Sequence, residues 1–433
     1  MRGFPVARRE WPSRRGSTAH ARQRDVSQER GREQVTLEDG SAPVSANPVP
    51  RDTGAPLRGI YIGADATNPT LILRIRSFLR AEVDLTAFTF RRYKFNTAFQ
   101  PEWKNIPLGT TVDRNYLYRL PALARALWKM LRHAPLLRAA DFIYARNLDL
   151  VLLGILARTF TCSRAKLVYE VEDVQEIFFK KTATGTLFRW LERWALNRID
   201  LLVVLSPAFL HGYFEPAQRY AGPCFVLENK LQLGDLPDTP TPKGDVWKGG
   251  SDRWVIGWFG TLRCPKSLRI LEDIATALGP KVEIHTRGYP TETGLDAFLR
   301  IVERHPNWRY DGEYTIPDDL EEMYGRVHFS WCLDFLDEHG NSPLLLACRM
   351  YQGGFYGAVP LVIAGSEMDR WLATAGVGHA FGAPHARSIV DFLRTVTPED
   401  YCAERTRIMQ RRRELFLEDG RETMALLQTI RDL

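Results

Sequence analysis

The chain has 433 residues, of which 45% are hydrophobic and 11% aromatic, enough to bury one or two cores of ordinary size. Its formal net charge is +6, but residues 1–32 alone hold nine Arg against three acidic residues, an excess that equals the whole net charge. The folded part is therefore electrically balanced, so the basic character of the chain does not indicate a nucleic-acid partner.

Residues 1–56 are rich in Arg, Ser, Pro and Gly and show almost no apolar periodicity. Such a segment cannot bury enough apolar surface to offset its loss of conformational entropy. We therefore expect residues 1–56 to form a disordered basic tail. A start codon placed too far upstream would explain this segment equally well.

The six cysteines are scattered without a C-x-x-C pair, and the histidines show no metal-ligand spacing. This pattern argues against a zinc site and a disulfide framework, so we predict no metal and no cofactor. No apolar run approaches the length of about 18 residues that a membrane-spanning helix needs. The expected location is the cytoplasm, with peripheral contact at the inner face of the plasma membrane.

From residue 58 onward, short apolar runs typical of strands alternate with helical patterns, which predicts parallel α/β units. The first series has predicted strands at 59–63, 83–90, 142–146, 166–171, 201–205 and 223–227. Its predicted helices lie at 71–80, 117–131, 148–159 and 187–197. These elements indicate a first Rossmann-like domain at 57–232.

The segment 233–252 combines prolines and glycines with polar residues and is typical of an interdomain linker. A second series follows, with predicted strands at 254–259, 282–286, 308–310, 327–333 and 359–363. Its predicted helices lie at 267–278, 293–302, 345–355 and 366–373. The chain is thus predicted to hold a second Rossmann-like domain at 253–400, facing the first across a cleft, and a helical segment at 401–433 that packs back across the first domain.

Ligands of open parallel sheets bind beyond the carboxyl ends of the strands. The turn after the first strand of the first domain contains no G-x-G-x-x-G, which removes the main support for a dinucleotide-binding dehydrogenase. In the second domain, Gly260 follows the first strand and permits close backbone approach, and Arg263 and Lys266 supply cations beside the free amides of a helix N-terminus. The pattern predicts a diphosphate site, with solvated surface cations as the alternative.

Acidic residues follow the predicted strand 166–171, where the first domain would face the cleft. Of these, Glu170 and Asp173 are placed to remove a proton from an acceptor hydroxyl. Acids are also favoured at helix N-termini by the helix dipole, and this remains the alternative.

Two stretches, 127–133 and 188–196, mix Trp, Leu and Arg at helical spacing. Basic amphipathic helices of this kind bind anionic membrane surfaces, which would suit an enzyme that extends a lipid-linked oligosaccharide. Core packing with arginines that extend to solvent is the alternative.

The segment 339–361, HGNSPLLLACRMYQGGFYGAVPL, resembles the donor-binding segment of family 4 glycosyltransferases of the two-domain GT-B type. It is most similar to the ExoL-like transferases of succinoglycan-type exopolysaccharide synthesis. Further stretches agree with this resemblance, namely GWFGTLRC at 257–264, RGYP at 287–290, ENK at 228–230, YARNLD at 144–149 and YEVED at 169–173. The resemblance covers roughly residues 58–395.

The resemblance implies that the second domain binds the donor, with Gly260, Arg263 and Lys266 at the diphosphate. Asn341 and Ser342 would then reach the sugar. Gln352 stands where the family has a ribose-binding Glu, and Leu344 stands where the first Glu of its E-x7-E motif would be. An amide still bonds a diol through its oxygen but carries no charge, so weaker donor binding, a different donor and loss of activity are all open.

The predicted function is transfer of a sugar from a nucleoside-diphosphate donor to a polyprenyl-linked or polysaccharide acceptor. The donor is a substrate and not a cofactor. Two alternatives remain. The departures at Leu344 and Gln352 favour a non-catalytic GT-B subunit of a polysaccharide assembly complex, and a nucleotide-sugar epimerase shares the same two-domain fold.

Overall fold

The computed structural model describes residues 55–92, 99–111, 116–236 and 253–433. The tail predicted for 1–56 and the linker predicted for 233–252 lie almost entirely outside the described residues. Residues Thr53–Leu433 form one compact unit.

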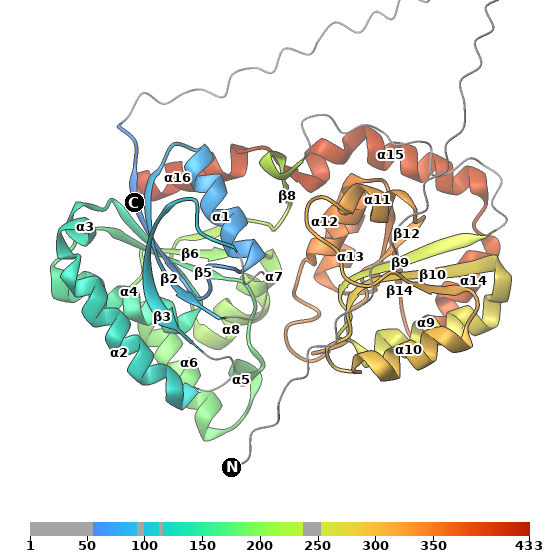
Figure 1. Ribbon diagram of the computed structural model, residues 1–433, viewed down its shortest axis with the longest axis horizontal. Helices are drawn as coiled ribbons and strands as arrows, with labels where there is room; N and C mark the ends of the chain where they lie inside the picture. The colour runs from blue at the N-terminus through green and yellow to red at the C-terminus, as the bar shows by residue number, and fades with distance from the viewer. Residues whose placement is uncertain (1–54, 93–98, 112–115, 237–252) are drawn as a thin grey trace, which may run out of the picture. The chain divides into compact units, whose positions relative to one another are not determined.

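The first domain is built on a seven-stranded parallel sheet with the order β3-β2-β1-β4-β5-β6-β7 (Figure 1). Its strands are β1 Arg58–Gly63, β2 Asp84–Arg91, β3 Lys104–Thr110, β4 Phe142–Arg146, β5 Lys166–Val171, β6 Leu201–Val204 and β7 Cys224–Val226. Its helices are α1 Pro69–Arg80, α2 Tyr116–Arg132, α3 Ala134–Ala139, α4 Leu148–Thr161, α5 Glu176–Phe179, α6 Ala183–Leu196, α7 Pro207–Phe209, the π-helical η1 Leu210–Phe214 and α8 Glu215–Gln218.

The second domain has a six-stranded parallel sheet with the order β11-β10-β9-β12-β13-β14. Its strands are β9 Trp254–Thr261, β10 Val282–Tyr289, β11 Trp308–Tyr310, β12 Phe329–Trp331, β13 Val359–Ile363 and β14 His379–Phe381. The remaining helices are α9 Pro265–Leu278, η3 Gly279–Lys281, α10 Leu295–Arg304, α11 Leu320–Gly325, α12 Cys348–Phe355, α13 Glu367–Ala375, α14 His385–Thr395, α15 Pro398–Phe416 and α16 Arg421–Asp432. The two parallel sheets confirm the predicted pair of Rossmann-like domains.

The helices of the first domain cover its sheet on both faces. Helices α2, α4 and α6 pack on one face, in the core that contains Ala126, Val151 and Ala195. Helix α1 packs on the other face together with α16, through a cluster that joins Ile75 and Phe78 to side chains of the C-terminal helix. The helices bury apolar surface on each face of the sheet, and each Å² of apolar surface removed from water stabilises the fold by roughly 25 cal/mol.

The last segment of the chain divides into two helices with different partners. Helix α15 packs on α12 of the second domain, and α16 joins the core of the first. Between them, β15 Leu417–Glu418 pairs in parallel with β8 Leu231–Gln232, which follows β7 and precedes η2 Leu233–Asp235. Within the predicted segment 401–433, only α16 packs on the first domain, whereas α15 packs on the second.

Some elements have no counterpart in the sequence prediction. Strand β3 lies at a sheet edge with only Leu108 of its residues buried, and β14 has three residues. Neither carries the alternating or continuous apolar pattern of a longer strand. The predicted helix 345–355 begins only at Cys348, because the preceding residues belong to a loop that contacts the first domain.

The ends of β9 and β10 approach each other at two glycines. Gly260 lies opposite Gly288 in the sheet, and both have positive φ, +112° and +125°. A Cβ at Gly288 would lie 1.8 Å from the Gly260 carbonyl oxygen. This close backbone approach at the carboxyl end of the sheet requires glycine.

Candidate functional site

Two of the predicted site residues, one from each domain, contact each other directly. Asn341, in the loop after β12, donates from Nδ2 to Asp173 Oδ1 at 2.8 Å. Its Oδ1 accepts the N–H of Val174 at 3.0 Å. The Asn341 amide thus binds both a carboxylate and a backbone amide in the segment that follows β5.

The position of Asp173 changes its acidity. The residue is exposed at the surface, and desolvation by the protein that packs nearby, together with the negative charge of Glu172, raises its pKa to about 6. The Asn341 hydrogen bond and the charge of Arg263 limit the rise. A carboxylate with a pKa near neutrality is suited to accept a proton at physiological pH.

Glu170 occupies a different environment from the one predicted. It is fully buried, and its carboxylate pairs with Arg74 and Arg146 at 3.2 Å each. Burial opposes ionisation, but the charges of Arg146 and Arg74 outweigh it and hold the Glu170 pKa below its ordinary value. The prediction of Glu170 as a base facing the acceptor is therefore corrected: its carboxylate is enclosed, and it orients the two arginines.

Glu172 takes the position at the surface that was expected of Glu170. Its Oε1 pairs with Arg146 at 2.5 Å and accepts the hydroxyl of Thr70 at 2.7 Å. These contacts tie the segment after β5 to the start of α1. Because Glu172 is adjacent to Asp173, its negative charge disfavours ionisation of the Asp173 carboxyl group and raises the pKa of that group.

The predicted phosphate cations are both paired with carboxylates. Arg263 lies 3.4 Å from Asp334 and remains 39% exposed. Lys266 lies 2.8 Å from Glu338 and 4.4 Å from the centre of the Phe335 ring. Both cations lie within a few residues of the Gly260 turn, and each is accessible enough to exchange its partner for a phosphate.

The N-terminus of α9 offers fewer free amides than the sequence predicts. Pro265 has no N–H, and the Ser267 amide donates to Cys264 Sγ at 3.3 Å. The Cys264 sulfur also accepts from the Phe335 amide. Phosphate recognition by this helix would therefore depend more on side-chain cations than on backbone groups.

Asp334 organises the donor-side residues and was missed by sequence reasoning. It is 2% exposed and lies within 3.5 Å of Arg349, within 3.4 Å of Ser342 Oγ, and next to Arg263. Although burial raises its pKa, the charge of Arg349 and the Leu336 amide outweigh this effect and lower it. Its place directly after a predicted strand was the available signal, because ligand sites lie at that end of a parallel sheet.

Comparisons with known proteins place the chain in a family. No protein-family model matches the sequence. The chain is 31% identical over 378 residues to the succinoglycan biosynthesis protein ExoL of Rhizobium meliloti, which covers 87% of the chain and 94% of ExoL. The chain belongs to the ExoL family.

Solved structures agree with the fold. Anabaena HepE in complex with UDP and glucose matches with a TM-score of 0.62 at 16% identity, over 86% of this chain and 99% of HepE. Sucrose-phosphate synthase from Thermosynechococcus elongatus matches with a TM-score of 0.65 at 13% identity, over 87% of this chain and 98% of the synthase. This ExoL-family chain is a glycosyltransferase with the GT-B fold, and it functions in exopolysaccharide synthesis.

The structure gives a physical reason for one departure from the family 4 pattern. In this ExoL-family chain, the Leu344 side chain packs against the backbone of Gly212. A Cβ added at Gly212 would lie 2.8 Å from the Leu344 side chain. The Leu344 carbonyl accepts the Ser206 hydroxyl at 2.5 Å. Position 344 thus contacts the first domain through apolar packing, a place where an unpaired carboxylate would be costly.

Gln352 lies on α12, half-buried, where its Oε1 is 3.4 Å from the Tyr324 hydroxyl. The Tyr324 ring is buried, so this contact holds the amide oxygen toward the interior of the second domain. Its role toward a donor ribose stays a prediction.

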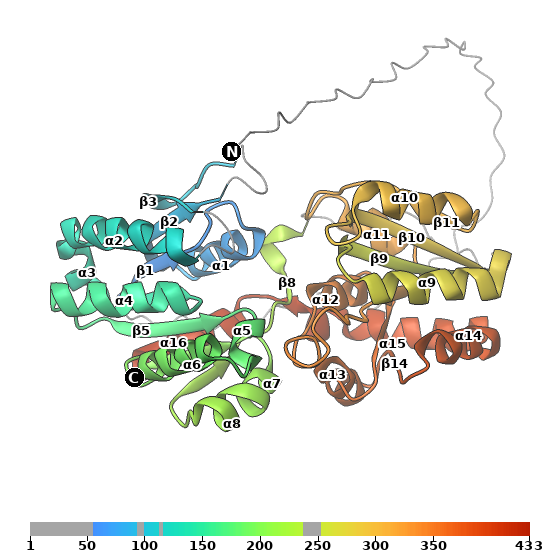
Figure 2. The same ribbon diagram turned by 90° about the horizontal axis from the view of Figure 1, so that it is seen from below.

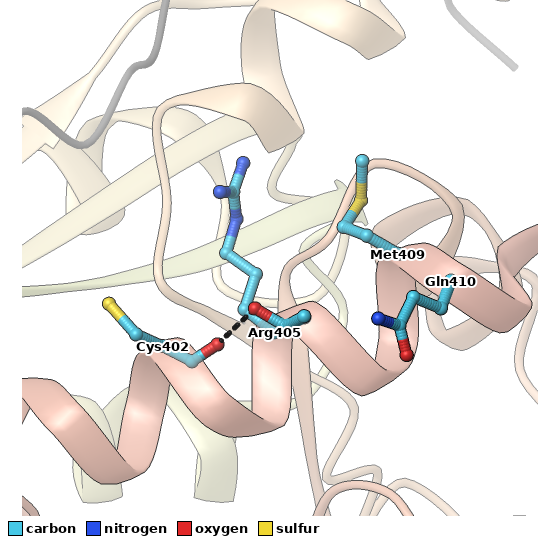
Figure 3. Close-up of a pocket in the computed structure, with 5 residues that line it drawn as sticks. Cys402, Arg405, Met409 and Gln410 are labelled. Atoms are coloured by element: carbon cyan, nitrogen blue, oxygen red, sulfur yellow. Dashed lines mark hydrogen bonds between the residues drawn. The ribbon is translucent and has the colours of Figure 1, made fainter. Parts of the chain in front are cut away.

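The described residues also bear on three other features, namely a metal site, a membrane-spanning helix and a further pocket. No cluster of three or more His, Cys, Asp or Glu among the described residues could hold a metal ion. None of the helices in the described part of the ExoL-family chain is long and apolar enough to cross a bilayer. A surface pocket of about 370 Å³ lies on α15, where Arg405 and Met409 rise from the helix beside Cys402 and Gln410 (Figure 3), and none of the predicted site residues lines it.

Proposed function

We propose that this chain transfers a glycosyl group from a nucleoside-diphosphate sugar to a hydroxyl of a lipid-linked oligosaccharide or polysaccharide. The observation that carries the proposal is the contact between Asp173 and Asn341, which joins a proton acceptor of the first domain to the donor-side loop of the second. The names of its relatives support the substrates, since HepE binds UDP and glucose and ExoL takes part in succinoglycan biosynthesis.

In the proposed reaction, the acceptor oxygen forms a bond to the anomeric carbon while the bond from that carbon to the diphosphate breaks. Arg263 and Lys266 stabilise the negative charge that grows on the departing diphosphate. Asp173 accepts the proton of the acceptor hydroxyl. No metal ion or cofactor takes part in this proposal, because the two cations balance the diphosphate charge.

The donor site is tested by titrating nucleoside diphosphates against Arg263→Ala and Lys266→Ala. Each loss should cost about 1.5–3 kcal/mol of binding, or roughly tenfold to a hundredfold in Kd, because charge-assisted hydrogen bonds are removed. Glu338→Gln should tighten binding, because Lys266 would no longer be paired with a carboxylate.

The matched control for these variants is Arg269→Ala, which removes an exposed cation from the same helix, α9. It should change nucleotide affinity by no more than the small, salt-screened effect of a surface charge. Tight wild-type binding that is equally unaffected by Arg263→Ala, Lys266→Ala and Arg269→Ala would refute the diphosphate site.

Activity is tested with purified chain, a panel of nucleotide sugars and polyprenyl-linked acceptors, with EDTA present throughout. We expect sugar transfer that requires both substrates. Turnover of the donor into an isomer without acceptor would instead identify an epimerase, and donor binding without any turnover would identify a non-catalytic subunit. The anomeric configuration of the product, read by NMR, decides whether a protein base is needed.

We further propose that the reaction takes place at the inner face of the cytoplasmic membrane. A polyprenyl-linked acceptor is held in the bilayer by its lipid, so its sugar end lies within reach of a peripheral enzyme. Exposed aromatic and basic side chains on α2 and α6 of the first domain support this location.

A further inference from the structure

One helical layer of the first domain exposes large apolar side chains. Helices α2, α3, α4 and α6 all contribute to it. The exposed fractions are 64% for Leu120, 58% for Trp128, 41% for Leu136, 63% for Phe160, 53% for Leu187 and 57% for Trp190. Single exposed apolar residues are ordinary, but several on adjacent helices indicate an interaction surface.

These helices are neighbours on one face of the sheet. Helix α4 contacts α2 on one side and α6 on the other, and α3 contacts both α2 and α4. Figure 2 shows α2, α4 and α6 following one another along the first domain. Because their inner sides pack on the sheet, the exposed side chains point outward from the same layer.

Only some of the aromatic residues in the two Trp-containing segments serve the core. Trp194 is half-buried and has the Arg198 guanidinium 3.9 Å from its ring centre. Trp128 is exposed and has the Arg132 guanidinium 4.7 Å from its ring centre. Core packing therefore explains Trp194 but not Trp128 and Trp190, which are 58% and 57% exposed.

The layer is strongly basic, with Asp149 at the start of α4 as its one partly exposed acid among the described residues. Residues 116–140 contain no Asp or Glu, and the only acid of α6, Glu192, is 1% exposed. Arg158 of α4 is paired with Asp200. Six further described cations belong to the layer, namely Arg125, Lys129, Arg132, Arg138, Arg189 and Arg193. Among the described residues, no ion pair joins any of the six to a carboxylate, and five of them donate to backbone carbonyls.

We propose that the outer face of α2, α3, α4 and α6 docks on an anionic lipid bilayer. Trp, Leu and Phe side chains would enter the interfacial region while the surrounding Lys and Arg contact acidic headgroups. We call this surface the docking face. The proposal rests on the proposed function, since a lipid-linked acceptor makes a membrane the place of reaction.

The docking face is connected to the candidate site. Arg189 of α6 donates to the carbonyls of Phe178 and Lys180, which fixes α6 to α5. Helix α5 begins at Glu176, three residues after Asp173. A chain held on the bilayer by α6 would therefore keep the segment that carries Asp173 near the membrane surface.

The test is co-sedimentation of the full chain with vesicles of phosphatidylcholine alone or mixed with phosphatidylglycerol. We expect binding only to the mixed vesicles, and weaker binding as salt rises. Trp128→Ala with Trp190→Ala, and separately Arg125→Glu with Arg132→Glu, should each weaken it by about tenfold or more, since a surface cation contributes about 1 kcal/mol. The N-terminal residues are identical in every variant, so differences report on the docking face.

Matched controls come from exposed residues of the second domain. Leu295→Ala on α10, which is 38% exposed, and Arg387→Glu on α14, which is 82% exposed, should leave vesicle binding unchanged. Equal binding by the docking-face variants and the wild type would overturn the proposal. A concentration-dependent dimer that the Trp variants abolish would also overturn it, by assigning the face to a second copy of this chain.

Transfer to a soluble acceptor separates this proposal from the proposed function. The docking-face variants should retain that activity and the wild-type melting temperature, because the substituted side chains lie at the surface. Loss of vesicle binding with retained soluble transfer is the expected result. Retained vesicle binding without any transfer activity would leave the docking face supported and refute the proposed function.

Discussion

At the scale of single residues, the contact between Asp173 and Asn341 has consequences for catalysis. Asn341 is bonded to the charged form of the carboxylate and lowers its pKa, while burial and Glu172 raise it. Arg263 and Asp334 also act on this group, with opposite signs. The thiol of Cys348 lies in the same field, where burial together with the charges of Glu172 and Asp173 raises its pKa to about 11, so it stays protonated.

The pH profile of transfer tests the role of Asp173. A base must be deprotonated, so kcat/KM should fall as the pH drops through about 6, the pKa of Asp173. Asn341→Ala removes a hydrogen bond that favours the charged form, so the fall should move to higher pH. Asp173→Asn should lower kcat by roughly 10²–10⁴.

The control for the profile is Asn197→Ala, which removes an exposed amide at the end of α6 and should leave the profile in place. Full activity in Asp173→Asn would show that another group takes the proton, and an unchanged profile in Asn341→Ala would exclude the positioning role of that amide.

At the scale of elements, two glycines of α12 belong to the segment that resembles a donor-binding segment, and they also serve helix packing. Gly353 and Gly354 lie within this helix and are both buried. A Cβ at Gly353 would lie 2.8 Å from Ser330, and one at Gly354 would lie 2.4 Å from the Phe416 ring of α15. The glycine pair therefore lets β12 and α15 approach α12 closely.

The prediction for α12 is that Gly354→Ala destabilises the chain. The added methyl group overlaps an aromatic ring in a filled core, which typically costs about 1–3 kcal/mol despite the better helix propensity of Ala. Urea unfolding measures the difference in free energy of unfolding. Gly382→Ala is the control, because nothing lies within 4 Å of its Cβ position, and similar stability of both variants would contradict the packing role.

At the scale of the whole molecule, the C-terminal segment joins the domains. Lys230, which is 14% exposed, binds Glu422 of α16 at 2.6 Å and lies 3.7 Å from Glu228. Glu228 in turn accepts the hydroxyl of Tyr351 from α12 at 2.9 Å. The ENK stretch thus contacts both the donor-side helix and the C-terminal helix, which makes it a structural junction between the domains.

The core of the first domain should depend on the last helix of the chain. Leu426 of α16 is fully buried against α1 and the sheet. Leu426→Ala should therefore lower the free energy of unfolding by about 2–5 kcal/mol, through lost burial and a cavity. Leu433→Ala, at a residue that is 36% exposed, is the control in the same thermal or urea unfolding experiment. Equal stability of the two variants would contradict a core role for α16.

The sequence by itself determined the two α/β domains, because strands buried on both faces need continuous apolar runs such as 201–205, and crossover helices show the helical period of about 3.6 residues. It also placed Asp173 and Arg263 near strand ends, where parallel sheets bind ligands, whereas Asn341 was named by the family resemblance. It could not separate Glu170 from Glu172, because the two positions have the same strand parity and their burial differs only because Glu170 lies within β5 and Glu172 follows its end.

Only the tertiary structure decided which of these residues meet. Asn341 and Asp173 are 168 positions apart in the sequence, and no local pattern pairs them. Asp334 likewise shows its role only when Arg263 and Arg349 lie beside it. Local periodicity determines elements because it reflects one face of one segment, whereas a site is defined by side chains that long-range packing brings together.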